Sequence, residues 1–304
     1  MPTAPPIEVA TDLIPPFFSA DAYSIWGPAV LANLIAAVML GVLGVYVVLR
    51  RVVFVSAALS QISTVGVALG FYLGALVELP LDRPPGLYHT VLANPVVLSF
   101  VLVAVGALAL AFEPRRSHLG RDARVGAVFV ASGAAVVLLL ASPRVVADRH
   151  EVEALLFGEA MAVAQPELIA LCVAAGAILL VHALFYKEFL FVSLDRPTAQ
   201  ATGLAAGRWD AVLMLTLAAA ISVATRAIGP VAVFGYLVLP STAALLVARR
   251  MWSAFALAIF FGALSAGLGY YVSWVYDLPT KSTGVAVAAV LIALGWLVRR
   301  FRPE

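Results

Sequence analysis

The chain has 304 residues, of which 63% are hydrophobic and 12% are charged, and its mean hydropathy is +1.03. Soluble domains are about half apolar and about a quarter charged, so this composition excludes an ordinary soluble domain and is typical of a chain surrounded by lipid. A single cysteine, Cys172, excludes an intrachain disulfide. The formal net charge of +2 says little by itself, but the positions of the charges indicate the topology.

Nine apolar stretches are candidates for membrane-spanning helices. A hydrocarbon layer of about 30 Å requires about 20 residues of helix, within which the backbone amides satisfy one another. The candidates are residues 28–49, 54–77, 93–112, 125–141, 168–186, 211–225, 229–248, 252–275 and 282–298, of which the sixth is the shortest. The sequence therefore predicts an all-α polytopic membrane protein with about nine transmembrane helices.

The basic residues favour one side of the predicted bundle. With the first loop inside, fourteen of the 19 Lys and Arg residues lie on the inner side: Arg50, Arg51, Arg115, Arg116, Arg121, Arg124, Lys187, Arg196, Arg208, Arg249, Arg250, Arg299, Arg300 and Arg302. Because positive charge is retained in the cytoplasm, the pattern predicts an external N-terminus and a cytoplasmic C-terminus. We expect residues 1–27, which contain no Lys or Arg, to be an external lead-in to a single transmembrane domain over residues 28–304.

Motifs for catalysis and nucleotide binding are absent. A phosphate-binding loop requires Gly-Lys-Ser/Thr, and neither Lys187 nor Lys281 follows a glycine. There is no Gly-x-Ser-x-Gly motif, and the segment from His150 lacks the second histidine of the His-Glu-x-x-His zinc motif. His182 lies well inside a predicted span, where packing is favoured over a proton relay. We therefore expect no catalytic residue, no bound cofactor and no nucleic-acid partner, and a transporter of this kind would take its energy from another subunit.

A polar stripe follows one side of the second predicted span. At about 100° per residue, its members fall within an arc of about 160°; they are Ser56, Ser60, Gln61, Ser63 and Thr64. Hydroxyl and amide groups in lipid seek partners or water. The stripe therefore either lines a translocation path, through Ser60, Gln61, Ser63 and Thr64, or holds helices together, and the spacing supports both equally.

Glycines and a proline mark further candidate helix contacts. Glycine recurs at every fourth position on an adjoining face of the second span, at Gly66, Gly70 and Gly74, which predicts close approach of another helix. In the seventh span, Pro240 precedes two hydroxyl residues, Ser241 and Thr242. The carbonyls that a proline frees need partners or water, so this kink is a second candidate for the path, although such kinks also occur in inert bundles.

A polar segment between the fifth and sixth spans is predicted to form a short cytoplasmic helix, in a loop of about residues 187–210. Asp195 can cap its first amides, Pro197 is tolerated in its first turn, and Gly203 can end it in a left-handed conformation. A rigid helix outside the bilayer could hold a soluble partner, although a simple connector is the commoner role. The candidate contact residues are Asp195, Arg196, Pro197, Thr198, Gln200, Gly203 and Leu204.

An outer segment over residues 143–166 is too charged to span the membrane. Its apolar part, residues 154–163, predicts a helix lying at the membrane surface or re-entering it. Four neighbouring side chains could receive a divalent metal: Asp148, His150, Glu151 and Glu153. An ordinary solvated loop is the favoured interpretation.

Six strings of residues, in this order, resemble the membrane permease of ATP-driven zinc and manganese importers over nearly the whole chain after residue 28. They are Gly-Val-Leu-Gly at 41–44 with Leu-Arg-Arg at 49–51, Ala-Leu-Ser at 58–60 with Gly-Val-Ala-Leu at 66–69, Leu-Phe-Gly at 156–158, Phe-Tyr-Lys-Glu at 185–188 with Val-Ser-Leu-Asp at 192–195, Leu-Val-Leu-Pro at 237–240, and Asp-Leu-Pro-Thr at 277–280 after Tyr271. The resemblance implies the permease fold of these importers in a bacterial plasma membrane.

The resemblance also implies partners. Such permeases pair as dimers, dock a cytoplasmic ATPase through a short helix that matches residues 195–204, and receive the ion from an external substrate-binding protein. The ATPase partner uses the ATP, and a divalent metal is the substrate. In this family the positions that match Ala57 and Gln61 usually carry an aspartate and a histidine, so the chain departs from its relatives where the metal would be held.

Three functions follow from these features. The first is an importer permease, in which ATP hydrolysis in a partner moves a dimer between outward and inward states. The second is a stand-alone secondary carrier of a small cation or polar solute, coupled to sodium through neutral oxygens. The third is a membrane scaffold that transports nothing.

Overall fold

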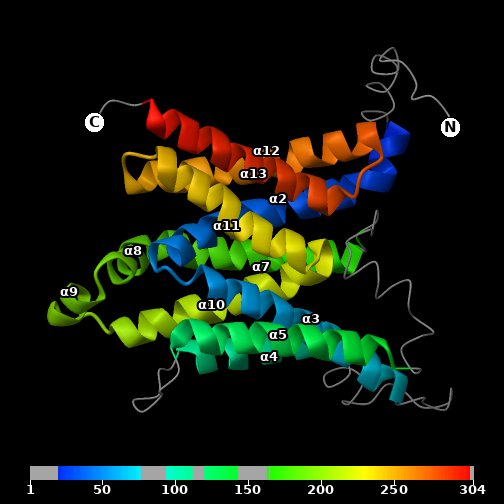
Figure 1. The fold of residues 1–304 in the computed structure, drawn as a ribbon, viewed down its shortest axis with the longest axis horizontal. Helices are drawn as coiled ribbons and strands as arrows, with labels where there is room; N and C mark the ends of the chain where they lie inside the picture. The colour runs from blue at the N-terminus through cyan, green and yellow to red at the C-terminus, as the bar shows by residue number, and fades with distance from the viewer. Residues whose placement is uncertain (1–19, 77–93, 112–119, 143–162, 164, 302–304) are drawn as a thin grey trace.

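The structure is a computed structural model that describes residues 20–76, 94–111, 120–142, 163 and 165–301. Within these residues every regular element is a helix, and nine long helices cross the molecule side by side (Figure 1). They are α2 (Ala20–Leu49), α3 (Val53–Leu76), α4 (Pro95–Ala111), α5 (Arg121–Leu140), α7 (Gln165–Leu184), α10 (Ala206–Ile228), α11 (Pro230–Val247), α12 (Met251–Tyr276) and α13 (Thr280–Arg300). Two short helices, α8 (Tyr186–Leu194) and α9 (Arg196–Ala201), project at one end of the bundle, which we call the α9 end.

The predicted all-α membrane architecture is confirmed. Eight of the long helices have the length and hydropathy to cross a membrane, and α4, with 17 residues, is an apolar helix just short of that length. The expectation of a short sixth span was wrong, because α10 has 23 residues. Its apolar stretch is bounded by Asp210 and Arg226, but the helix continues through both, since each is ion-paired to a neighbouring element.

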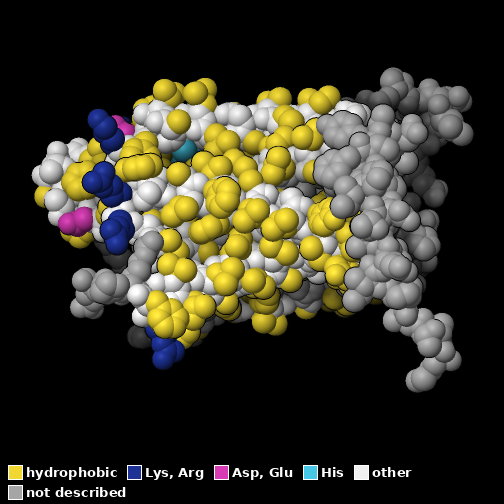
Figure 2. Space-filling model, turned by 90° about the horizontal axis from the view of Figure 1, so that it is seen from above, with side chains coloured by type: hydrophobic (Ala, Val, Ile, Leu, Met, Phe, Trp, Pro, Cys, Tyr) yellow, Lys and Arg dark blue, Asp and Glu magenta, His cyan; other side chains and the backbone are white. Residues whose placement is uncertain are grey.

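Burial separates central helices from outer ones. In α2 72% of the spanning window is buried, whereas in α5 and α13 only 11% and 28% are buried. Helix α2 packs against α7, α10, α11 and α12, while α5 and α13 lie on opposite sides of the bundle (Figure 1). The outer helices therefore present apolar side chains to lipid, and Figure 2 shows this apolar surface next to the α9 end.

Small residues set the closest helix contacts. A Cβ atom built at Gly44 of α2 would collide with the backbone carbonyl of Leu237 and the hydroxyl of Ser241, both on α11. Gly66 and Gly70 of α3 lie directly against the backbone of α4, so close packing at these two glycines is confirmed. At Gly74, by contrast, a Cβ would have no described atom within 4 Å, and the predicted helix contact is not found there.

The link between α2 and α3 is a tight turn. Val52 N donates to Val47 O at 3.1 Å and Arg51 N donates to Val48 O at 3.0 Å, which is the hydrogen-bond pattern of a Schellman cap. The residue at the left-handed position, usually glycine, is Arg51, with φ of 56°. The turn leaves Arg51 exposed and lets Arg50 reach between neighbouring helices.

Candidate functional site

Helix α9 has the local structure that the sequence predicts. Asp195 is its N-cap: one carboxylate oxygen accepts from Thr198 N at 3.1 Å and the other from Thr198 Oγ1 at 2.5 Å. These hydrogen bonds hold the pKa of Asp195 below its ordinary value of 3.8. Pro197 lies in the first turn, and Gly203 has φ of +86° after the last one. All three local predictions are confirmed.

One face of α9 is held by the bundle and the other is exposed. Ala199 is fully buried and packs with Val192 of α8 and Ala206 of α10. Leu204 is half-buried, and the other six candidate contact residues are exposed: Asp195, Arg196, Pro197, Thr198, Gln200 and Gly203. Helix α9 is therefore held in place on one face and has an exposed polar surface on the other, as a docking site for a soluble protein requires.

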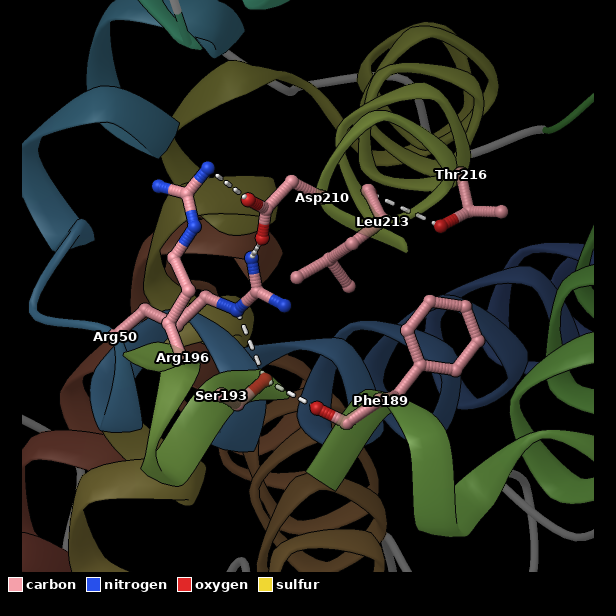
Figure 3. Close-up of polar contacts among 7 residues, drawn as sticks. All are labelled: Arg50, Phe189, Ser193, Arg196, Asp210, Leu213 and Thr216. Carbon is pink, nitrogen blue, oxygen red and sulfur yellow. Dashed lines mark hydrogen bonds and ion pairs between the residues drawn. The ribbon is translucent and has the colours of Figure 1, made fainter. Parts of the chain in front are cut away.

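An ion-pair cluster involves Arg196, the first residue of α9 (Figure 3). Asp210, near the start of α10, accepts from Arg50 at 2.5 Å through Oδ1 and from Arg196 at 2.9 Å through Oδ2. Arg50 Nε donates to Ser193 Oγ at 2.8 Å, and Ser193 Oγ donates to the Phe189 carbonyl at 2.6 Å. A single carboxylate thereby links the end of α2, the first residue of α9 and α10.

The two ion pairs of Asp210, which we call the Arg50 arm and the Arg196 arm, differ in their exposure to solvent. The side chains of Arg50 and Asp210 are 11% and 19% exposed, whereas that of Arg196 is 58% exposed. These groups border a cavity of about 580 Å³ that Arg51 also lines. The sequence pattern singles out Arg196 but not its contacts with Asp210, Arg50 and Ser193; the available signal was an acidic residue, Asp210, at the start of a span on the side that carries most of the basic residues.

The polar stripe of α3 is mostly satisfied within its own helix. Ser60 Oγ lies 3.0 Å from the Ser56 carbonyl and 3.1 Å from that of Ala57, and Thr64 Oγ1 donates to the Ser60 carbonyl at 3.0 Å. Both hydroxyl residues are buried. Among the predicted path residues on α3, only Gln61 is partly exposed.

Four serine hydroxyls connect neighbouring helices. Ser63 Oγ of α3 lies 2.8 Å from Ser99 Oγ of α4, to which Ser222 Oγ of α10 donates at 3.0 Å. On α11, Ser241 Oγ lies 2.9 Å from the Leu237 carbonyl and 2.9 Å from the Gly41 carbonyl of α2. In this conformation Ser63 and Ser241 make helix contacts, whereas the neighbouring Thr242 is partly exposed.

The described residues contain no group of three or more His, Cys, Asp or Glu side chains that could hold a metal ion. Ala57 is buried and offers no ligand. His182 stacks on Phe189, with ring centroids 4.4 Å apart, and its Nδ1 lies 2.9 Å from the Ile178 carbonyl, which supports the packing interpretation. The four outer candidates, Asp148, His150, Glu151 and Glu153, lie outside the described residues, as do residues 154–162 of the predicted surface helix.

A second ion pair lies at the opposite end of the bundle. Arg226 Nε of α10 donates to Glu167 Oε1 of α7 at 2.6 Å, beside a cavity of about 330 Å³. Helix α10 is therefore ion-paired near both of its ends.

A bundle of membrane-spanning helices with an exposed short helix at its charged end defines a polytopic membrane protein. The ABC 3 transport family model matches residues 22–299. The chain belongs to the ABC 3 transport family, and it is a multi-pass protein of the bacterial plasma membrane.

Relatives cover nearly the whole chain. The manganese transport system membrane protein MntC of Halalkalibacterium halodurans is 27% identical over 275 residues, which cover 90% of this chain and 87% of the relative. The high-affinity zinc uptake system membrane protein ZnuB of Haemophilus influenzae is 24% identical over 280 residues, which cover 91% and 98%. A chain in the solved structure of PsaBC from Streptococcus pneumoniae in complex with Fab superposes with a TM-score of 0.79 at 21% identity, covering 96% of this chain and 98% of that one. This likeness confirms the permease fold.

Proposed function

We propose that the chain is the transmembrane permease subunit of an ATP-driven importer of divalent metal ions, manganese or zinc. The observation that carries the proposal is the family match over residues 22–299, together with relatives of nearly equal length that are named for manganese and zinc transport. The exposed α9 at the basic end of the bundle supports it from the geometry.

Our proposal orients the α9 end to the cytoplasm. Lys and Arg side chains gather at that end of the molecule (Figure 2), as the retention of positive charge in the cytoplasm requires. The C-terminal α13 ends on the same side, with Arg299 and Arg300 in its last turn. A cytoplasmic ATPase would then dock on α9, a second permease copy would complete the path, and an external binding protein would deliver the ion to the opposite end.

The proposed path follows the partly exposed face of α3 at Gln61 and of α11 at Thr242. Oxygen donors suit Mn²⁺, whereas Zn²⁺ prefers nitrogen and sulfur ligands. An amide oxygen at position 61 therefore suits manganese better than zinc. Ser60, Ser63, Thr64 and Ser241 line the proposed route only if helix movements release them from the hydrogen bonds described above.

Copurification and metal accumulation test the proposal together. The chain should purify with an ATPase in a fixed ratio, and cells that express the complete system should accumulate Mn²⁺ above cells that lack this chain. Uptake into liposomes that contain only the permease, driven by a sodium or proton gradient, would instead establish a secondary carrier. Accumulation of Zn²⁺ without Mn²⁺ would contradict the choice of manganese but not the transport class.

Replacement of residues 195–204 by a neutral linker tests the docking helix. The variant should insert normally and lose the coupling between ATP hydrolysis and uptake, because the ATPase has no handle. Unchanged coupling would refute the role of α9.

Gln61→Leu tests the path. Uptake should be abolished, because the change removes the partly exposed amide of the proposed route, while dimer assembly remains intact. Gln165→Leu, at an exposed position at the start of α7, is the matched control and should transport normally. Normal uptake by Gln61→Leu would assign the polar stripe to packing alone.

A further inference from the structure

The contact between α9 and the transmembrane helices depends on very few polar groups. Among the described residues, Arg196 is the one charged side chain of α9 with an ion pair in the bundle, and its partner is Asp210. The other attachment is the small apolar contact around Ala199. These two contacts, together with the chain itself at both ends of α9, join the helix to the bundle.

Asp210 connects α9 to two long helices, α10 and α2. It is part of α10, and its other oxygen holds Arg50 at the end of α2. Arg50 is 11% exposed and donates to Ser193 as well, so its guanidinium is fixed on two sides. At the far end of α10, the Arg226 pair with Glu167 joins that helix to α7. A contiguous set of packed and charged contacts thus runs from α9 to helices α2, α7 and α10.

We propose that Asp210 is a positioning residue that ties the coupling helix α9 to α2 and α10, so that displacement of α9 by the ATPase reaches these helices through the Arg196 and Arg50 ion pairs. This inference rests on the proposed function. It assigns different tasks to the two arms: the buried Arg50 arm holds α2 and α10 together, and the exposed Arg196 arm connects them to the moving helix.

The two arms also differ in how they can be tested. Removal of Asp210 leaves Arg50 buried without its counter-ion, which endangers the fold itself. Removal of Arg196 leaves the buried pair intact, and the loss of a largely exposed charge costs little stability. Arg196→Gln therefore breaks the link to α9 while keeping the Asp195 cap and the bundle.

The experiment uses the complete importer, permease with ATPase, reconstituted in liposomes with Mn²⁺ as the transported probe. Arg196→Gln should keep thermal stability, and in complexes that retain the ATPase the Mn²⁺ imported per ATP hydrolysed should fall about three- to fivefold, as expected for loss of one partly exposed ion pair. Arg196→Lys, which preserves the charge, should restore most of the ratio. Arg249→Gln, an exposed arginine after α11 with no ion pair in the described structure, should behave like the wild type.

Other outcomes have distinct meanings. An unchanged ratio in Arg196→Gln would overturn the proposal while leaving the transport function in place. Loss of ATPase binding in that variant would also overturn it, because Arg196 would then be a direct contact of the ATPase. A wild-type complex that imports neither Mn²⁺ nor Zn²⁺ would reject the proposed function, and this inference with it.

Discussion

Polar groups in the middle of the bundle and polar groups at the α9 end are satisfied by different partners. In the middle, Ser60 and Thr64 bond to carbonyls one turn away in their own helix. At the α9 end, Asp210 joins residues from three separate elements. A short hydroxyl side chain bonds within its own helix or reaches a neighbour only where two helices pack closely, as Ser241 does, whereas a long arginine side chain extends to more distant elements. Small-residue packing therefore holds the interior, and charge ties together the end that we assign to the ATPase.

The first way to break this comparison is to fill the closest interior contact. Gly44→Ala places a Cβ atom against Leu237 and Ser241 of α11, so α2 and α11 must separate, at a cost of about 3 kcal/mol or more. The yield of monodisperse protein and its unfolding in detergent measure this effect. Gly176→Ala is the control, because a Cβ there meets no described atom within 4 Å, and it should be neutral or slightly stabilising. Equal behaviour of the two variants would contradict the close contact.

The second test removes the central charge at the α9 end. Asp210→Asn leaves Arg50 in a largely buried site without its counter-ion, and we expect a loss of about 2 kcal/mol, discounted from the fully buried case because Asp210 is 19% exposed. Chemical unfolding in detergent provides the measurement. Adding Arg50→Gln should recover part of the loss, since no unpaired charge remains. A double variant less stable than Asp210→Asn would show that Arg50 contributes by other contacts.

The third test compares two interior serines. Ser241→Ala removes a hydroxyl that binds α11 to the Gly41 carbonyl of α2 and should cost about 1 kcal/mol. Ser60→Ala removes a hydroxyl bonded only within α3 and should cost less than about 0.5 kcal/mol. Thermal unfolding of both variants under one condition decides the order, and a reversed order would mean that local hydrogen bonds also hold the interior.

The smallest expected effect is a local response of α9 to acid. The pKa of Asp195 is lowered by its hydrogen bonds with Thr198, so the stabilising cap is present at neutral pH and is lost only as the pH falls through that lowered value, below 3.8. Amide exchange over Arg196–Ala201 should accelerate there, relative to the intrinsic rate. Asp195→Asn retains a capping side chain without a titrating group and should show no such step. A step near neutral pH would refute the assignment to Asp195.

The sequence predicts the features that depend on nearby residues. Nine helices follow from apolar stretches, and the cap, first turn and end of α9 follow from Asp195, Pro197 and Gly203, because each acts on backbone within a few residues. The close packing at Gly66 and Gly70 follows from their spacing, but the partner helix does not.

The contacts that define the candidate site depend on residues far apart in the chain. Arg50 and Asp210 are separated by 160 positions, and Ser99 and Ser222 by 123. A single sequence does not show which residues of two distant helices lie opposite each other. A charged residue near the end of an apolar stretch is therefore interpreted as the end of the span, although it can be the ion-pair partner of a residue on another helix. The same limitation explains why α10 was expected to be short.

The Schellman turn gives the Leu-Arg-Arg segment two different roles at two times. During insertion in the proposed orientation, Arg50 and Arg51 leave α2 before Asp210, 160 residues later, has been synthesised; both charges then count toward the orientation of the first helix. After folding, the turn separates them: Arg50 is neutralised by Asp210, and Arg51 remains at the surface. The nascent loop is therefore more positive than the mature surface that replaces it, and one arginine serves first as a topological signal and later as an internal counter-ion.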